Sequence, residues 1–424
     1  MGKKVALLHY TAPPVVGGVE SVLAHHARQM ARAGHSVTVL AARGEQWAED
    51  IAFTRLPLAD SRHPDILAAK ALLDAGQVPP DFEAQVNLLV ADLQAAASGL
   101  DVLIAHNVCS LNKNLALTAA LHQLNGRPGF PRLILWHHDL AWTTPRYLPE
   151  LHPGYPWDLL RTDWPGVTQV VVSAERQREL AELLSLPFAR IHVVPNGIDV
   201  ASFLKLEAAT IKFVEKLDIL SAAPLLLLPV RITPRKNIEL AIRVIAELRA
   251  EAARSPEAAH NPPPGLGRPM LVVTGPLGPH NPANSGYLDQ LLALREQLGL
   301  ARAVIFLAEH TQAYLPDAVI ADFFRLADAL FLPSREEGFG IPLLEAAFSR
   351  RPIFCADIPS LRELGGPDAL FFSPDADPAE LAALIRQTLS ANPTFRFATR
   401  ARATYAWESI YTKYIDPLLM EAEP

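Results

Sequence analysis

The chain has 424 residues, half of them hydrophobic, which is long enough for two domains of about 200 residues with their own cores. Its 38 Lys and Arg residues are outnumbered by 45 Asp and Glu residues, and the net charge of −7 argues against a nucleic-acid-binding protein. The balance gives no support for a polybasic membrane patch, although it leaves peripheral membrane contact open. No apolar run reaches the roughly 18–20 residues of a membrane span, so we expect no transmembrane segment.

The two cysteines, Cys109 and Cys355, fall in separate predicted domains and show no metal-ligand spacing. Such sparse cysteine use is typical of a reducing compartment. The first residues lead straight into a strand-like run without a visible signal peptide. We therefore expect a cytoplasmic protein, and the sequence does not indicate its oligomeric state.

In the first half of the chain, strand-like runs alternate with helical patterns, as is typical of a parallel α/β domain. The predicted strands cover residues 5–8, 36–40, 100–105, 133–136, 170–172 and 191–194. A helix is expected over about 19–33, and residues 44–99 are less regular, with helical segments around 66–75 and 82–97. Most polar and glycine motifs follow directly after a strand, where open α/β sheets bind ligands.

A second α/β series begins in the middle of the chain. Its predicted strands cover residues 225–228, 270–273, 304–307, 329–332 and 352–355. We place the first domain at 1–205 and the second at 206–404. The fold class predicted from the pattern is therefore α/β, with two domains that each contain a parallel sheet.

The most informative motif is the segment from Glu337 to Glu345, which follows a predicted buried strand. Its glycines allow a close approach of the backbone to a ligand, and a helix is expected to begin near Pro342. The helix start offers free N–H groups and a positive dipole end, which suit a phosphate. The two carboxylates would repel phosphate, so we expect them to accept hydrogen bonds from hydroxyl groups. A ligand with both phosphates and sugar hydroxyls meets both demands.

The segment from Pro333 to Ala346 resembles the E-x7-E signature of retaining glycosyltransferases of family 4. The resemblance extends over most of the chain and implies the GT-B fold, in which two Rossmann-like domains face each other across a cleft. In that fold the second domain binds most of the donor. The resemblance also implies that a final helix, at about 405–424, crosses back to the first domain.

The same resemblance assigns donor contacts. It implies that Glu337 binds the transferred sugar and Glu345 the nucleotide ribose. The donor-binding residues within the motif are then Glu337, Gly338, Phe339, Gly340, Ile341 and Glu345.

Arg231 and Lys236 follow the predicted strand 225–228 and resemble the phosphate-binding R-x4-K pattern of the family, with Val230 where glycine is usual. An arginine fork and a lysine point charge can together stabilise a diphosphate leaving group as its negative charge develops. We therefore expect both residues, with Glu337, to be catalytic. We expect no metal and no cofactor beyond the nucleotide-sugar co-substrate.

Gly17 and Gly18 form a glycine turn between the first strand and its helix. In isolation such a pair is often only a tight turn, but the resemblance implies a loop that bends over the donor phosphates. Glu20 is then an acceptor contact, or alternatively an acid favoured by the dipole at the start of the helix.

His137, His138 and Asp139 follow the predicted strand 133–136. A histidine here can accept a hydrogen bond from a sugar hydroxyl or orient the reacting groups. The resemblance matches His138, by its place before Asp139, to a catalytic histidine, with His137 as the alternative. Either histidine also fits a structural role at the end of a strand.

We expect the acceptor to be bound by the first domain. The predicted contacts are Glu20, Asn107, His137 and Asp139. Asn107 belongs to a polar cluster with His106, Lys113 and Asn114, which suits a polar or anionic acceptor.

The sequence thus predicts a retaining, metal-independent glycosyltransferase. It would move a hexosyl group from a nucleotide-diphosphate sugar, of the GDP-mannose or UDP-glucose type, to a hydroxyl of a sugar or small polar acceptor. Two alternatives stay open: a GT-B nucleotide-sugar epimerase, and a non-catalytic protein that binds nucleotide sugars. Nucleoside diphosphate release that requires an acceptor would separate the first from a transferase, and donor hydrolysis would exclude the second.

Overall fold

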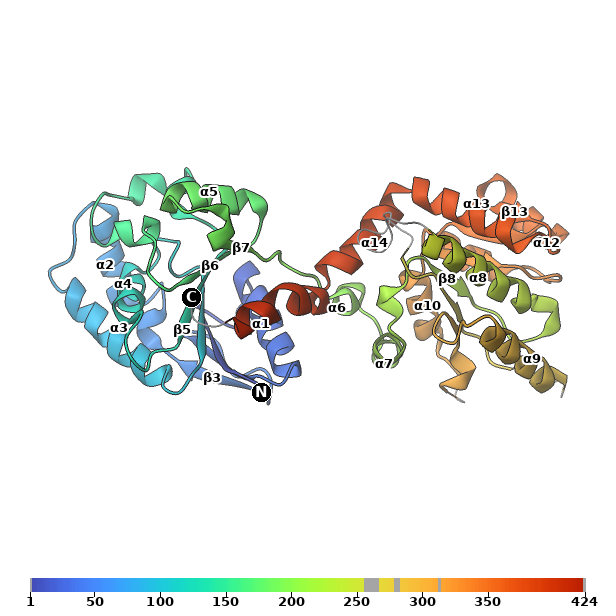
Figure 1. Ribbon diagram of the computed structural model, residues 1–424, viewed down its shortest axis with the longest axis horizontal. Helices are drawn as coiled ribbons and strands as arrows, with labels where there is room; N and C mark the ends of the chain where they lie inside the picture. The colour runs from blue at the N-terminus through green and yellow to red at the C-terminus, as the bar shows by residue number, and fades with distance from the viewer. Residues whose placement is uncertain (1, 255–266, 278–282, 312–313, 422–424) are drawn as a thin grey trace. The chain divides into compact units, whose positions relative to one another are not determined.

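The computed structural model describes residues 2–254, 267–277, 283–311 and 314–421 (Figure 1). The chain divides into two compact units. Unit 1 comprises Met1–Ile198 and Tyr405–Pro424, and unit 2 comprises Asp199–Thr404. In the described part of the chain, no helix combines the length and the apolar character needed to cross a membrane.

Unit 1 contains a seven-stranded parallel sheet in the order β3-β2-β1-β4-β5-β6-β7. The strands are β1 (Lys4–Leu8), β2 (Ser36–Ala41), β3 (Ile51–Arg55), β4 (Val102–His106), β5 (Arg132–His137), β6 (Thr168–Val171) and β7 (Ile191–Val193). The helices are α1 (Gly18–Arg32), α2 (Pro64–Asp74), α3 (Phe82–Ala96), α4 (Leu115–Leu124) and α5 (Ala174–Leu184). The edge strand β3 lies in the stretch where no strand was predicted, because its sequence, Ile-Ala-Phe-Thr-Arg, has only one fully buried residue.

Side chains of successive strand residues point to opposite faces of the sheet, so unit 1 has a core on each face. Ala6 and Leu8 belong to the core that includes residues of α3 and α4. Val5 and Leu7 belong to the opposite core, which includes residues of α1 and of the carboxy-terminal segment. The two helical layers fix the sheet, and with it the loops at its carboxyl edge.

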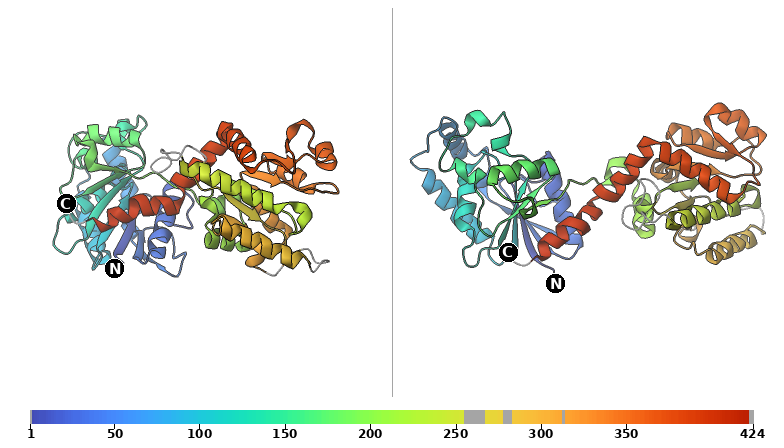
Figure 2. Two further views of the ribbon diagram at one scale, coloured as in Figure 1. Left: turned by 45° about the vertical axis from the view of Figure 1, so that its right-hand side comes forward. Right: turned by 45° about the horizontal axis from the view of Figure 1, so that its top comes forward.

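The carboxy-terminal segment packs beside α1 in unit 1, as the views in Figures 1 and 2 show. It consists of α15 (Trp407–Ile410), a π-helical turn over Tyr411–Ile415 and α16 (Asp416–Met420). The His35 Nε2 atom lies 2.9 Å from the Tyr411 hydroxyl, and Arg132 donates to the carbonyl of Leu418 at 2.5 Å. These contacts attach the last helix to unit 1 rather than to the domain that precedes it in sequence.

The division between the units lies earlier than the predicted boundary at 205/206. The helix α6 (Val200–Leu204) belongs to unit 2. Ala201 and Leu204 pack against the core of unit 2, and Arg325 donates to the carbonyl of Leu204 at 2.8 Å. The sequence did not reveal this packing, because such a short helix carries little periodicity.

Unit 2 contains a six-stranded parallel sheet in the order β10-β9-β8-β11-β12-β13. The strands are β8 (Leu225–Leu228), β9 (Met270–Val273), β10 (Val304–Phe306), β11 (Ala329–Leu332), β12 (Ile353–Ala356) and β13 (Leu370–Phe372). The helices after α6 are α7 (Ala208–Leu217), α8 (Ile238–Arg254), α9 (Ala283–Gln297), α10 (Asp317–Leu326), α11 (Ile341–Phe348), α12 (Pro359–Gly365), α13 (Pro378–Ala391) and α14 (Pro393–Tyr405). Both sheets have the order expected of Rossmann-like domains.

Candidate functional site

The strand order of each sheet reverses at one point, and such a switch point is where open α/β sheets bind ligands. In unit 1 the reversal lies between β1 and β4, and in unit 2 between β8 and β11. The carboxyl ends of these strands carry most of the predicted site residues. Each unit therefore has its own candidate site.

Lys236 and Glu337 form an ion pair at the switch point of unit 2. The Lys236 Nζ atom lies 2.6 Å from Glu337 Oε1, and the two side chains are only 8% and 10% exposed. Ser334 also donates its hydroxyl to Glu337 Oε1, at 2.7 Å. Burial lowers the pKa of Lys236, and the bond to Glu337 opposes that shift. The structure thus brings together a cation and an acid that are far apart in the sequence.

Asn237 fixes the turn that carries Lys236. Its backbone is left-handed, with φ of 53°, and its amide donates to the carbonyls of Pro333 at 3.1 Å and Pro374 at 2.9 Å. Arg235 adds a bond from its guanidinium to the carbonyl of Glu336 at 3.1 Å. The loop after β8 is therefore tied to the loop after β11.

Arg231 lies on the same loop but is exposed. Among the described residues, its side chain forms no ion pair or hydrogen bond. The neighbouring Val230, which stands where the family pattern has glycine, is buried, and Gly275, after β9, lies against its backbone carbonyl. A Cβ atom at Gly275 would collide with the carbonyl of Val230.

Gly340 sets the start of α11. Its φ of 100° is a conformation that favours glycine, and a Cβ atom there would lie 2.5 Å from Leu361. The helix begins at Ile341 with Pro342 in its first turn, as the sequence predicted. Gly338 has open space around it, and Ser360 donates its hydroxyl to the carbonyl of Glu337 at 2.8 Å.

The remaining motif residues stand around this helix start. Phe339 is 56% exposed and Ile341 is 59% exposed, so both present apolar surface to a ligand or to solvent. Glu345 is half-buried on α11, and burial, with a smaller effect from Asp317, raises its pKa. Its predicted contact with the nucleotide ribose stays a prediction.

Gly17 and the Glu20 side chain lie close together in unit 1. Gly17 caps α1 with an extended backbone, and a Cβ atom there would collide with the Glu20 carboxylate. Glu20 accepts a hydrogen bond from the Thr11 hydroxyl and lies 4.0 Å from His9 Nε2. Gly18 has no neighbour within 4 Å of a Cβ atom. Glu20 is thus already engaged at the carboxyl edge of the sheet.

Asn107 organises the loop after β5. It is buried, and its side-chain oxygen accepts from the backbone N–H of His138 at 2.9 Å and of Asp139 at 3.0 Å. Its amide nitrogen donates to Asp139 at 3.4 Å, and Ser110 donates to its oxygen at 3.2 Å. Asn107 therefore positions His138 and Asp139, and its predicted contact with an acceptor stays a prediction.

The structure distinguishes the two adjacent histidines. His137 is buried, and its Nε2 atom lies 2.8 Å from the Gln169 amide oxygen. His138 is half-buried, and its Nε2 atom lies 3.3 Å from His106 Nδ1. Burial lowers the pKa of each to about 4, so both imidazoles are neutral at physiological pH. His138 is therefore the more exposed of the two, and its contact with a ligand stays a prediction.

His9 was not singled out from the sequence. It follows β1 directly, and its Nδ1 atom lies 2.7 Å from the carbonyl of His106. A carbonyl only accepts, so Nδ1 of His9 donates and Nε2 is free to accept. The position of His9 at the end of the first predicted strand is the signal that would have identified it.

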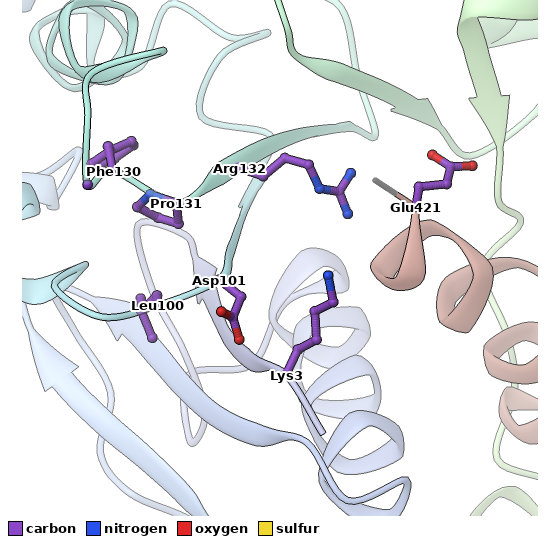
Figure 3. Close-up of a pocket in the computed structure, with 8 residues that line it drawn as sticks. Lys3, Leu100, Asp101, Phe130, Pro131, Arg132 and Glu421 are labelled. Atoms are coloured by element: carbon purple, nitrogen blue, oxygen red, sulfur yellow. The ribbon is translucent and has the colours of Figure 1, made fainter. Parts of the chain in front are cut away.

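A separate cavity of about 350 Å³ lies at the opposite, amino-terminal edge of the unit 1 sheet (Figure 3). Lys3, Asp101, Arg132 and Glu421 contribute its charged lining. None of the predicted site residues lines it. Among the described residues, no group of three or more His, Cys, Asp or Glu side chains is arranged to hold a metal ion.

Family models match both units. The model described as "Glycosyltransferase Family 4" matches residues 16–202, and "Glycosyl transferases group 1" matches residues 211–405. A solved glycosyltransferase involved in lipopolysaccharide biosynthesis, WaaG, aligns over 99% of this chain and 100% of its own, with 17% identity and a TM-score of 0.35.

Three curated relatives are also similar. Mannosylglucosylglycerate synthase of Thermotoga maritima is 25% identical over 82% of this chain and 79% of its own. D-inositol 3-phosphate glycosyltransferase of Nocardia farcinica is 30% identical over 68% of this chain and 64% of its own. MMP alpha-(1->4)-mannosyltransferase of Mycolicibacterium hassiacum is 25% identical over 96% of this chain and 95% of its own.

The two family models together span nearly the whole chain, and each coincides with one parallel-sheet unit. The protein is therefore an enzyme that transfers hexosyl groups. It belongs to glycosyltransferase family 4 and has the α/β GT-B fold of two Rossmann-like domains.

Proposed function

We propose that the protein is a retaining glycosyltransferase that uses a nucleotide-diphosphate sugar as donor and a hydroxyl of a sugar or small polar molecule as acceptor, without a metal ion. The observation that carries this proposal is the buried Lys236–Glu337 pair at the switch point of unit 2. Lys236 offers a cation to a phosphate, and Glu337 offers an acceptor to a sugar hydroxyl. The Lys236 Nζ and Glu337 Oε1 atoms lie 2.6 Å apart.

The pair suits leaving-group chemistry. In the free enzyme Glu337 balances the charge of Lys236, which limits the cost of burying either group alone. A bound diphosphate provides a second anion for Lys236, and Arg231 is free to add its fork from the exposed loop. As the bond between sugar and phosphate breaks, both cations stabilise the charge that develops on the leaving group. Glu337 and Glu345 accept hydrogen bonds from the transferred sugar and the ribose, respectively.

The acceptor side is assigned to unit 1. There the neutral imidazole of His138 exchanges hydrogen bonds with acceptor or sugar hydroxyls. In the mechanism that we favour, the departing phosphate helps to deprotonate the acceptor hydroxyl on the same face of the sugar, which retains the anomeric configuration. Two of the relatives, mannosylglucosylglycerate synthase and MMP alpha-(1->4)-mannosyltransferase, have names that refer to mannosyl groups. Their names favour mannose as the sugar that this protein transfers.

The test is a thermal-shift screen of nucleoside diphosphates and nucleotide sugars, followed by turnover assays on the best donor. A ligand at 100 times its dissociation constant should stabilise the protein by about 2.7 kcal/mol. We expect nucleoside diphosphate release to require an acceptor, to continue in EDTA, and to give a product with the donor's anomeric configuration by proton NMR. Donor conversion without an acceptor would indicate an epimerase, and donor binding without any turnover would indicate a binding protein.

A further inference from the structure

Lys113 is a half-buried cation at the carboxyl edge of the unit 1 sheet that the chemistry above does not use. It lies in the turn between β4 and α4, directly before Asn114, whose side chain caps α4 by accepting from the N–H of Leu117 at 3.0 Å. Its ammonium lies 6.0 Å from the centroid of the Tyr10 ring, and Tyr10 follows His9 at the end of β1. Lys113 thus stands next to the proposed acceptor side.

No carboxylate neutralises this cation within the part of the chain that the structure describes. The acids of the same region are engaged elsewhere. Glu150 accepts from Lys70 at 3.0 Å and from Asn112 at 2.7 Å. Glu20 accepts from the Thr11 hydroxyl, and Asp139 is bound to Asn107.

Several polar groups close to Lys113 are neutral. Burial, above all, lowers the pKa of His9 to about 4, and the charge of Lys113 adds to that effect. The adjacent Asn112 and Asn114 are both buried amides. The one other cation that lines a pocket together with Lys113 in the described structure, Lys70, is already paired with Asp74 and Glu150. A cation that is partly withdrawn from water and has no carboxylate partner is stabilised most by an anion.

Two polar atoms beside Lys113 also lack a partner. The Tyr10 hydroxyl and the Asn112 side-chain oxygen are buried and accept or donate no hydrogen bond in the described part of the molecule. A buried polar atom without a partner is destabilising, so natural structures rarely leave one unsatisfied. A ligand group, or water held by it, that reaches Lys113 is able to supply these partners.

We propose that Lys113 binds an anionic group of the acceptor, a phosphate or a carboxylate, and so selects a charged acceptor over its neutral counterpart. The inference rests on the proposed function, because it takes unit 1 as the acceptor side. Lys113 acts on binding, not on the reacting atoms.

The test compares acceptors that differ only in charge: glucose, glucose 6-phosphate and glucuronate. Each is titrated calorimetrically into the full-length protein and assayed for turnover with the best donor. The variants are Lys113→Gln, which removes the charge, and Lys113→Arg, which keeps it. The matched control is Lys4→Gln, which removes an exposed cation at the opposite edge of the same sheet.

We expect the wild type to prefer glucose 6-phosphate or glucuronate to glucose. Lys113→Gln should raise the dissociation constant and KM of the charged acceptor about 10-fold or more, with KM for the donor unchanged, as for loss of a charged hydrogen bond. Lys113→Arg should restore most of the affinity, and Lys4→Gln should behave as wild type. The comparison of glucose 6-phosphate with glucuronate shows whether a phosphate or a carboxylate is preferred.

Equal use of glucose and its charged counterparts, or equal losses for both in Lys113→Gln, would overturn the assignment. The calorimetric titration measures acceptor binding without turnover, so it tests the role of Lys113 even if the enzyme turns over none of the donors. Failure of every nucleotide sugar to bind would instead count against the proposed function.

Discussion

The carboxyl edges of the two sheets have the same topology, but different titratable groups dominate them. In unit 2 the switch point holds a formal ion pair, Lys236 and Glu337, with Arg231 exposed on the same loop. In unit 1 it holds His9, His106 and His138, whose pKa values burial lowers far enough to keep the rings neutral. Under the proposed function, the unit 2 edge binds the charged diphosphate and the unit 1 edge binds the acceptor.

The difference is consistent with the two tasks that the proposed function assigns to the two edges. A diphosphate leaving group needs permanent cations, whereas a hydroxyl acceptor needs donors and acceptors whose charge does not change near neutral pH. Among the described charged groups at the unit 1 edge, Lys113 stands out because Glu20 and Asp139 are engaged by Thr11 and Asn107, whereas Lys113 has no carboxylate partner. The following predictions, from the largest expected effect to the smallest, test whether the two edges differ as described.

Acid should destabilise unit 1 before unit 2. Burial lowers the pKa values of His9, His137 and His138 to about 4 and that of His26 to about 3. Below pH 6.5 the histidines of the unfolded chain therefore bind protons that those of the folded unit do not. As the pH is lowered, the free energy of unfolding decreases until the pH reaches the pKa values of the folded-state histidines. At pH 5 the expected loss is on the order of 2 kcal/mol for each such histidine.

The six tryptophans make this loss measurable, because all lie in unit 1. Denaturant unfolding followed by tryptophan fluorescence should shift to lower denaturant between pH 7 and pH 5. Constant unit 1 stability over that range would contradict the neutral state of the histidines.

Replacement of either Lys236 or Arg231 by alanine should reduce turnover by about 100–1,000-fold. The two variants should differ in stability, which the sequence alone did not predict. Lys236→Ala leaves Glu337 buried without its partner, and breaking a buried pair costs about 3–5 kcal/mol. Arg231→Ala removes an exposed side chain and should leave the melting temperature nearly unchanged.

Steady-state kinetics and thermal melts of the two variants check this prediction. Wild-type turnover in both variants would refute the phosphate assignment. Equal losses of stability would show that the Lys236–Glu337 pair is not energetically coupled.

The two carboxylates of unit 2 should give different binding defects, each about 10-fold. Glu345→Gln should weaken both the bare nucleoside diphosphate and the sugar donor, because the ribose is common to both. Glu337→Gln should spare the bare diphosphate and weaken only the sugar donor. Calorimetric titration of each variant with each ligand tests the division, which fails if Glu337→Gln loses the bare diphosphate as badly as Glu345→Gln.

The glycine turns of the two units should respond differently to alanine. Gly340→Ala combines a left-handed backbone with a contact to Leu361 and should cost about 1–3 kcal/mol of stability. Gly18→Ala adds a methyl group where nothing lies within 4 Å and should cost less than about 0.5 kcal/mol. Chemical denaturation measures both, and a tolerated Gly340→Ala would show that the start of α11 relaxes easily.

Sequence reasoning identified most residues at the carboxyl edges, because strands and the polar residues that follow them are adjacent in the chain. The helix start at Pro342 illustrates this, since proline and glycine act locally. Contacts between loops were not visible in the same way. The amide of Asn237 joins two loops through Pro333 and Pro374, and no local pattern indicates such a bond.

The sequence by itself determined that the protein is an α/β chain of two parallel-sheet domains with an E-x7-E motif, because strand and helix periodicity are local properties. Only the tertiary structure decided which of His137 and His138 is half-exposed, that Glu20 is engaged by Thr11, and that α6 belongs to unit 2. These outcomes depend on packing and hydrogen bonds between segments that the fold brings together. Periodicity cannot encode them, since each depends on a partner far away in the chain.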